Sequence, residues 1–240
     1  MALISSSYKL GLALLLAGLP QQVLAQSASC RIPDRLPDAQ VEYPPSATQR
    51  RVTSVTNYLL ALSWSPEHCR SARNRTSSQC DGSAGRFGFV LHGLWPETDG
   101  PAYPQWCAPA PALPRAIIRE NFCMTPSVDL LQHEWAKHGT CMTSDPQRYF
   151  KPARIMYNVM RYPDMDRMSR DRNLTVGTFR LNFARANPGI RPDMIQIVKT
   201  RENWLSEVRV CLARNFRPQR CPSYLRMSSD RSKLKIWRGR

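Results

Sequence analysis

What this sequence lacks narrows its function before any motif is considered. No apolar run after residue 25 is long enough to cross a bilayer, and no internal repeat indicates a solenoid or a propeller. None of the eight cysteines forms a Cys-x-x-Cys pair, which excludes zinc ribbons and thioredoxin-like redox sites. Acidic residues are few, 18 against 34 Lys and Arg, so the formal charge is +16. A field of this sign attracts polyanions, either nucleic acid or an anionic membrane surface.

The first 25 residues have the pattern of a secretory signal. Lys9 precedes an apolar stretch over residues 10–19, and small residues follow up to Ala25. We expect cleavage after Ala25 and free export. An even number of cysteines in an exported chain then predicts four disulfides, although the sequence alone leaves their pairing open. Residues 26–56, rich in Pro, Ser and Gln, are expected to form an irregular arm.

Helices and strands are predicted to alternate without a regular βαβ rhythm, which indicates an α+β fold in a single domain. The basic segment 226–240 allows two interpretations, additional contacts to phosphates or a frayed end. We expect loops at 65–85 and 96–114, strands at 57–64, 86–91, 195–199 and 207–212, and helices at 114–122, 125–138, 149–161 and 178–186.

Histidine is scarce, with four residues in the chain. His68 falls in a predicted loop, where we expect no catalytic role. His92 ends a predicted apolar strand. His133 and His138 begin and end the run His-Glu-Trp-Ala-Lys-His, on a helix that we expect Thr125 to cap.

The run from His133 to His138 places several polar groups on one side of its helix. At about 100° per residue, His133, Lys137, Glu134 and His138 share one arc of about 140°. The intervening Trp and Ala face away. Such an arc is either a solvated surface or a cluster of groups that transfer protons.

A zinc protease is the obvious alternative for a run that begins His-Glu. That site needs two histidines four residues apart on one helix face. Here His133 and His138 are five apart, and Lys137 places a positive charge where the cation would bind. The spacing therefore argues against a metal site, and we expect no metal and no cofactor.

Cleavage of RNA through its own 2′-hydroxyl fits these residue types. One imidazole takes the 2′ proton and another protonates the leaving 5′ oxygen, because histidine has a pKa near the working pH. A lysine and a further imidazole stabilise the negative charge that gathers on the phosphorane. DNA lacks the attacking hydroxyl, so we expect it to remain intact.

Two segments carry a resemblance to a known family. Residues 89–97 (FVLHGLWPE) and 133–141 (HEWAKHGTC) resemble the two active-site signatures of the ribonuclease T2 family. Residues 62–69 (LSWSPEHC) are similar to the family's first strand and the turn after it, and the late stretch from Glu207 to Cys211 also fits. Both signatures occur in the expected order.

The resemblance implies a fold and a set of disulfides. Residues 57–225 are expected to form a ribonuclease T2-like catalytic domain, with a central, mostly antiparallel sheet flanked by helices. The family's pattern implies the pairs Cys107–Cys141 and Cys211–Cys221, which leaves Cys69–Cys80 and Cys30–Cys123 as the expected remaining pairs.

The resemblance also implies a role for each residue of the two signatures. His92 is expected to be the general acid at the leaving oxygen, and His138 the general base on the 2′-hydroxyl. His133 is expected to hold the phosphate, while Glu134 and Lys137 orient and stabilise the pentacovalent phosphorus. Sequence gives no geometry, so the reverse order of acid and base stays open.

Three residues are candidates for binding the substrate's bases. Trp95 is either a stacking platform or a core residue that closes the turn. Glu97 is either an acceptor for bases with an exocyclic amine or a plain surface acid. Tyr103 is a further stacking candidate. Leu130 stands where some relatives carry an aromatic residue, so the preference at a second base is open.

The residues and the resemblance together lead us to expect an exported, metal-independent endoribonuclease of low base specificity. It is expected to cut single-stranded RNA to 2′,3′-cyclic phosphates and then to 3′-phosphates, in a bacterial periplasm or outside the cell. We expect a monomer without stable membrane association. The alternatives are a secreted cationic protein that binds RNA or anionic lipid without catalysis, and a metalloenzyme.

Overall fold

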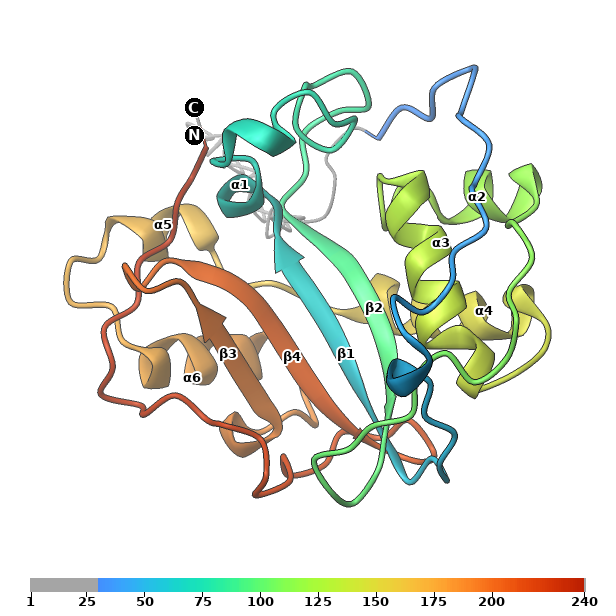
Figure 1. Cartoon of the computed structure of the whole chain (residues 1–240). Coiled ribbons are helices and arrows are strands. Elements are labelled where there is room, and N and C mark those ends of the chain that lie inside the picture. Colours follow the sequence, from blue (N-terminus) through green and yellow to red (C-terminus); the bar gives the residue numbers. More distant parts are fainter. Residues whose placement is uncertain (1–29, 240) are drawn as a thin grey trace, which may run out of the picture.

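The computed structural model describes residues 30–239, so the expected signal segment 1–25 lies outside the described residues. One antiparallel sheet has the strand order β2-β1-β4-β3, and helices pack around it (Figure 1), which confirms the predicted α+β fold. The strands are β1 (Asn57–Trp64), β2 (Phe89–Glu97), β3 (Ile195–Lys199) and β4 (Leu205–Ala213), and the α-helices are α1 (Ser65–His68), α2 (Arg115–Asn121), α3 (Val128–Lys137), α4 (Pro146–Val159), α5 (Met165–Arg170) and α6 (Val176–Ala186).

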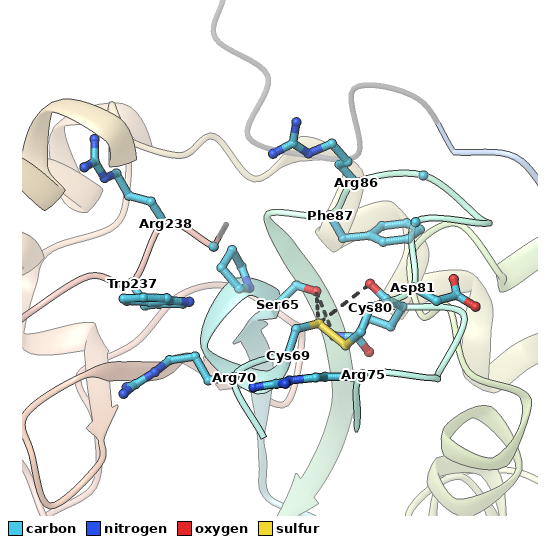
Figure 2. A pocket seen from close by; sticks show the side chains of 15 residues that line it. Ser65, Cys69, Arg70, Arg75, Cys80, Asp81, Arg86, Phe87, Trp237 and Arg238 are labelled. Atoms are coloured by element: carbon cyan, nitrogen blue, oxygen red, sulfur yellow. Dashed lines mark hydrogen bonds between the residues drawn. A yellow bond between two sulfur atoms is a disulfide. The ribbon is translucent and has the colours of Figure 1, made fainter. Parts of the chain in front are cut away.

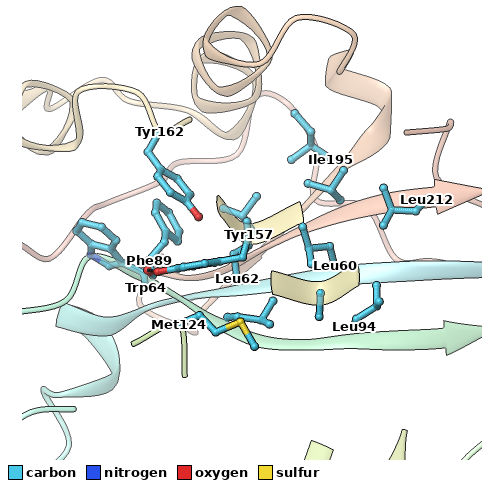
Figure 3. Packing of buried hydrophobic residues seen from close by; sticks show 14 of the residues in the cluster. Leu60, Leu62, Trp64, Phe89, Leu94, Met124, Tyr157, Tyr162, Ile195 and Leu212 are labelled. Atoms are coloured by element: carbon cyan, nitrogen blue, oxygen red, sulfur yellow. Dashed lines mark hydrogen bonds between the residues drawn. The ribbon is translucent and has the colours of Figure 1, made fainter. Parts of the chain in front are cut away.

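The hydrophobic core lies on one face of this sheet. Leu60 and Leu62 of β1 are fully buried, and Tyr157 of α4 packs near them (Figure 3). The hydroxyl of Tyr157 donates to the backbone oxygen of Phe89, so α4 is tied to β2. Burial of an aliphatic side chain such as that of Leu60 contributes about 1.5–3 kcal/mol to the stability of the fold. The opposite face of β1 and β4 carries polar side chains such as Glu207, and this is the face on which the candidate site lies.

The second strand differs from its prediction. A strand was expected at 86–91, whereas β2 runs from Phe89 to Glu97 and includes Pro96. Proline lacks the N–H that a central strand needs, but β2 is at the edge of the sheet, where that donor is dispensable. Beyond this edge lies Met124, whose carbonyl accepts from the N–H of Leu91 at 2.7 Å.

The helix that carries the histidine run begins later than predicted. Ser127, not Thr125, caps α3, because its hydroxyl accepts from the N–H of Leu130 at 3.2 Å. The hydroxyl of Thr125 is used elsewhere and donates to the carbonyl of Leu91 at 2.7 Å. Helix α5 was not predicted. His68, which was expected in a loop, is the last residue of α1.

Four disulfides fasten the surface segments to this core. They join Cys30 to Cys123, Cys69 to Cys80, Cys107 to Cys141 and Cys211 to Cys221, the same pairs as those expected. The bridge from Cys107 to Cys141 holds the loop after β2 against the end of α3. The two segments that carry the signature histidines are thus linked covalently as well as by packing.

The two ends of the described chain lie on the domain. The arm before β1 is irregular apart from a 3₁₀ turn at Ala47–Gln49, and it runs along α3 (Figure 1, blue). In the C-terminal segment Leu234 and Ile236 are buried, so the interpretation of this segment as a frayed end is wrong. Within residues 30–239, no helix has the length and the apolar character to span a membrane.

Candidate active site

A pocket of about 370 Å³ lies over β2 and β4 beside α3. Leu59 of β1 and Arg209 of β4 belong to its lining, as do residues 224–226. The pocket brings together all eight residues that the sequence analysis proposed for catalysis and base binding: His92, Trp95, Glu97, Tyr103, His133, Glu134, Lys137 and His138.

A β-bulge explains how β2 supplies three residues to one pocket. In its pairing with β1, Gly93 lies opposite Ala61 and Leu91 opposite Leu62, so His92 is the extra residue. A bulge turns the bulged side chain and reverses the in-out alternation beyond it. His92, Trp95 and Glu97 therefore line the same pocket, although strict alternation would separate His92 from the other two.

Helix α3 supplies the other half of the site. Trp135 and Ala136 pack into the core, as the helical spacing indicated. Glu134 is only 2% exposed and His138, the residue after the helix, only 4%. The interpretation of this arc as solvated surface is therefore wrong, since two of its four polar groups are buried and all four line the pocket. The N–H of Trp106 donates to the carbonyl of Lys137 at 2.8 Å and helps to fix the end of the helix.

Glu134 is the buried centre of the pocket. One carboxylate oxygen accepts from Nε1 of Trp95 at 2.8 Å, and the other lies 3.7 Å from Nε2 of His92. Burial raises the pKa of this carboxyl, although His92, His133 and Lys137 oppose the shift. Gly93 makes the close approach possible, because a Cβ there would overlap the carboxylate of Glu134.

His92 is held from its other side by a residue that the sequence analysis missed. Its Nδ1 lies 2.6 Å from the carboxylate of Glu207 in β4, which also accepts from Arg209. Burial opposes a charge on His92, but the hydrogen bond to Glu207 and the charges of Glu207 and Glu134 outweigh it and raise its pKa. Burial likewise opposes a charge on Glu207, yet His92 and Arg209 lower its pKa.

His138 has the opposite environment. Its ring lies 5.5 Å from that of Trp95 in a stacked arrangement and 6.0 Å from that of Tyr103. Its Nδ1 is buried without a hydrogen-bond partner in the described part of the chain. Burial lowers the pKa of His138 well below its ordinary value, and the charges of Lys137, His133 and His92 lower it further. The pocket thus contains one imidazole that favours the charged form and one that favours the neutral form.

His133 takes its partner from the N-terminal arm. Its Nδ1 lies 2.7 Å from the carboxylate of Glu42, and the ring of Trp106 meets its ring edge-on at 5.6 Å. Nothing in the sequence around Glu42 indicates this contact, which joins residues 91 positions apart. By contrast, the sequence does contain a signal that could have identified Glu207 and Arg209. They are two charged residues on one face of the predicted strand 207–212, which is otherwise apolar.

The candidate base-binding residues surround the guanidinium of Arg209. This group lies 4.7 Å from the ring centre of Trp95, so a base can stack on that face only if Arg209 moves. Trp95 is half-buried and lines the pocket rather than the core. Glu97 is buried, which contradicts its interpretation as a surface acid. Burial raises the pKa of Glu97 to about 7, and the charge of Arg209 limits the shift.

The pocket has no evident metal-ligand set. Across residues 30–239, no group of three or more His, Cys, Asp or Glu side chains is arranged to hold a metal ion. The carboxylate of Glu134 is shared between Trp95 and His92, and Lys137 lines the same space. The chemistry that this arrangement can support is proton transfer beside a bound anion.

Comparisons with known proteins agree in one family. The model of the ribonuclease T2 family matches residues 55–221. A probable ribonuclease of Haemophilus influenzae is 34% identical over 135 residues, which span 51% of this chain and 49% of the relative. A ribonuclease of Aeromonas hydrophila is 45% identical over 84 residues, spanning 35% of this chain and 36% of the relative. The chain thus spans half or less of the length of these two relatives. Among solved structures, an RNase-related protein from Calystegia sepium has the same fold, with a TM-score of 0.59, 20% identity, and coverage of 74% of this chain and 96% of that one.

Proposed function

Because this chain belongs to the ribonuclease T2 family, we propose that it is an endoribonuclease that cleaves single-stranded RNA by general acid and base catalysis. One observation carries the proposal. A buried His138 whose surroundings favour its neutral form and a His92 whose neighbours favour its charge line one pocket, with Glu134 between Trp95 and His92. A base and an acid with separated pKa values are the pair that transphosphorylation requires.

In the first step the 2′-hydroxyl of the substrate attacks the adjacent phosphorus. His138 takes the proton of this hydroxyl as the O2′–P bond forms. The P–O5′ bond breaks, and Nε2 of His92 gives its proton to the departing 5′ oxygen. Lys137 and His133 stabilise the negative charge on the phosphoryl oxygens, and the products are a 2′,3′-cyclic phosphate and a free 5′-hydroxyl.

The second step uses the same pair with the roles exchanged. His92, now neutral, takes a proton from water as the water oxygen attacks the cyclic phosphate. The P–O2′ bond breaks, and the protonated His138 returns its proton to the 2′ oxygen. The product is a 3′-phosphate, and both histidines regain their starting forms. Glu134 stays in place throughout, where it orients His92 and Trp95.

A time course with defined dinucleotides tests this proposal. Because the cyclic phosphate is the product of the first step and the substrate of the second, we expect cyclic phosphates to appear first and 3′-phosphates later. Because every proton moves through a side chain of the pocket, both products should form at the same rate in EDTA. The matching deoxydinucleotides should stay intact. Binding of RNA without any product would contradict the proposal and favour the non-catalytic alternative, whereas inhibition by EDTA that added metal reverses would favour a metalloenzyme.

The pH dependence of kcat/KM provides a second test. The base must be unprotonated, so activity should fall as the pH drops through the lowered pKa of His138. The acid must be protonated, so activity should fall as the pH rises through the raised pKa of His92. Replacement of Glu207 by Gln removes the negative charge that helps to raise the pKa of His92 while keeping an oxygen that can accept from Nδ1, and we expect the alkaline limb to move to lower pH. Glu202→Gln removes an exposed acid outside the pocket and should leave that limb in place; equal shifts in both variants would contradict the assignment.

The setting of the reaction is also part of the proposal. Four disulfides suit an oxidising compartment, which supports export to a periplasm or to the medium. The pocket is built from one chain, so a monomer suffices for activity. Low base specificity is expected because Arg209, rather than a set of fixed base-reading groups, covers the face of Trp95.

A further inference from the structure

A second hollow, of about 720 Å³, lies at the other end of β1 from the active-site pocket. It is formed by α1, by the segment from Cys69 to Phe87 and by residues 237–239 (Figure 2). We call it the arginine cleft, after four arginines in its lining, Arg70, Arg75, Arg86 and Arg238. Residues 237–239 lie outside the region that the family model matches.

The charge of the arginine cleft is one-sided. Its lining contains a single acid, Asp81, whose carboxylate accepts from the N–H and the hydroxyl of Ser83. Two of the arginines are paired, Arg70 with Glu67 and Arg238 with Asp166. The other two, Arg75 and Arg86, have no acidic partner within residues 30–239 and are exposed.

An aromatic ring accompanies these charges. Trp237 is half-buried, with the guanidinium of Arg70 5.0 Å from its ring centre and Trp204 edge-on at 5.8 Å. An indole beside arginines is the combination that binds single-stranded nucleic acid, since the ring stacks on a base and the guanidinium groups hold phosphates.

The backbone of the arginine cleft is fixed. The disulfide from Cys69 to Cys80 crosses it, and the amide of Gln79 donates to the hydroxyl of Ser65 at 2.9 Å. Nε1 of Trp64 donates to the carbonyl of Trp237 at 2.6 Å, which attaches the C-terminal segment to β1. A site held in this way loses little conformational entropy when a ligand binds.

The arginine cleft lies within reach of a strand bound at the active site. Leu59 lines the active-site pocket and Ser65 lines the cleft, six residues apart on the same chain. At about 3.3 Å per strand residue, the two sites are about 20 Å apart along β1. His68 belongs to α1, whose first residue, Ser65, lines the cleft, and it is near enough to His92 for the charge of His92 to lower its pKa.

We propose that the arginine cleft binds single-stranded RNA several nucleotides away from the scissile phosphate, with Arg75 and Arg86 on phosphates. Trp237 stacks on a base, either with the ring face away from Arg70 or after that guanidinium has moved. The inference rests on the proposed function, because it assumes that RNA occupies the pocket that contains His92 and His138. It assigns the cleft to substrate binding and gives it no part in the chemical step.

The test compares two double variants that remove the same charge. The cleft variant, Arg75→Ala/Arg86→Ala, removes the two unpaired arginines of the cleft. The control variant, Arg172→Ala/Arg185→Ala, removes two exposed arginines elsewhere on the surface. Binding is measured with a labelled single-stranded DNA of about 12 nucleotides, which the enzyme is expected not to cut. Turnover is measured with an RNA of the same length and with a dinucleotide.

We expect the cleft variant to lose affinity for the DNA. The slope of log K against the logarithm of the salt concentration should become shallower by about 1.4, since each of two lost phosphate contacts to a single strand contributes about 0.7. Between about 50 and 200 mM salt, the affinity of the unaltered protein should then fall about sevenfold more than that of the variant. KM for the long RNA should rise, while cleavage of the dinucleotide, which cannot reach the cleft, should not change.

Equal binding and KM in the two double variants would overturn the inference and leave the proposed function intact. A cleft variant that keeps oligonucleotide binding but no longer binds phosphatidylserine vesicles would overturn it in favour of a membrane surface. The proposed function fails on a different result, in which the unaltered protein cleaves neither the dinucleotide nor the long RNA.

Discussion

Replacement of His138 by alanine is expected to lower kcat for RNA cleavage by about 10²–10⁴-fold. The reason is that its neighbours in the pocket, Trp95 and Tyr103, offer no group that would take a proton from the 2′-hydroxyl near neutral pH. His92→Ala should cause a loss of similar size, because Glu207 and Glu134 then have no imidazole between them to protonate the leaving oxygen. Both losses are measured as initial rates on a dye-quenched oligoribonucleotide, with circular dichroism to confirm the fold.

The two variants should differ in a way that identifies acid and base. A substrate whose leaving group is p-nitrophenolate needs no protonation, so it should restore much of the activity of His92→Ala and none of that of His138→Ala. In the pH profiles, His138→Ala should lose the acidic limb and His92→Ala the alkaline limb. His68→Ala removes the fourth histidine, which does not line the pocket, and should keep the turnover of the unaltered protein.

The opposite pattern of rescue would reverse the order of acid and base and leave the proposed reaction class in place. Retention of full activity by either variant would contradict the mechanism itself. Loss of RNA affinity without loss of kcat would show that the imidazoles bind substrate rather than transfer protons.

The parts of the site that were predictable from sequence are those that neighbouring residues determine. Helical spacing placed His133, Glu134 and Lys137 on one arc, and the structure brings this arc to the pocket. His138 follows the helix directly, so its position depends on the same local geometry. The strand at 195–199 and the helix that ends at Ala186 were likewise readable from local periodicity, since each buries a continuous apolar face.

The parts that were not predictable depend on contacts between distant segments. Glu207 reaches His92 across 115 positions, and Glu42 reaches His133 across 91. The length of β2 was missed because Pro96 is acceptable only in an edge strand, and strand order cannot be read from a single segment. The bulge at His92 is equally non-local, because a strand has a bulge only relative to the register of its partner.

Gly93 is the position where a single methyl group should damage the site most. A Cβ at this residue would overlap the carboxylate of Glu134 and lie 2.6 Å from both its Cδ and Nε1 of Trp95. Glu134 is buried and held between Trp95 and His92, so it can yield only by moving away from its partners. We expect Gly93→Ala to lower kcat by about 10²-fold, the cost of displacing catalytic groups by about 1 Å, and to destabilise the fold by about 1–3 kcal/mol.

A second substitution distinguishes this overlap from a general intolerance of β2 to any side chain at residue 93. In a Glu134→Ala background the overlapping carboxylate is absent and only Nε1 of Trp95, which has then lost its acceptor, remains close to the new Cβ. Gly93→Ala should therefore cost less stability there than in the unaltered chain, as measured by thermal unfolding of the four proteins. Gly100→Ala is the matched control, because a Cβ at that loop residue meets no atom within 4 Å and should change neither Tm nor kcat. If Gly93→Ala were as harmless as Gly100→Ala, the close packing of β2 against Glu134 would not exist in solution, and the orientation of His92 by that carboxylate would have to be abandoned.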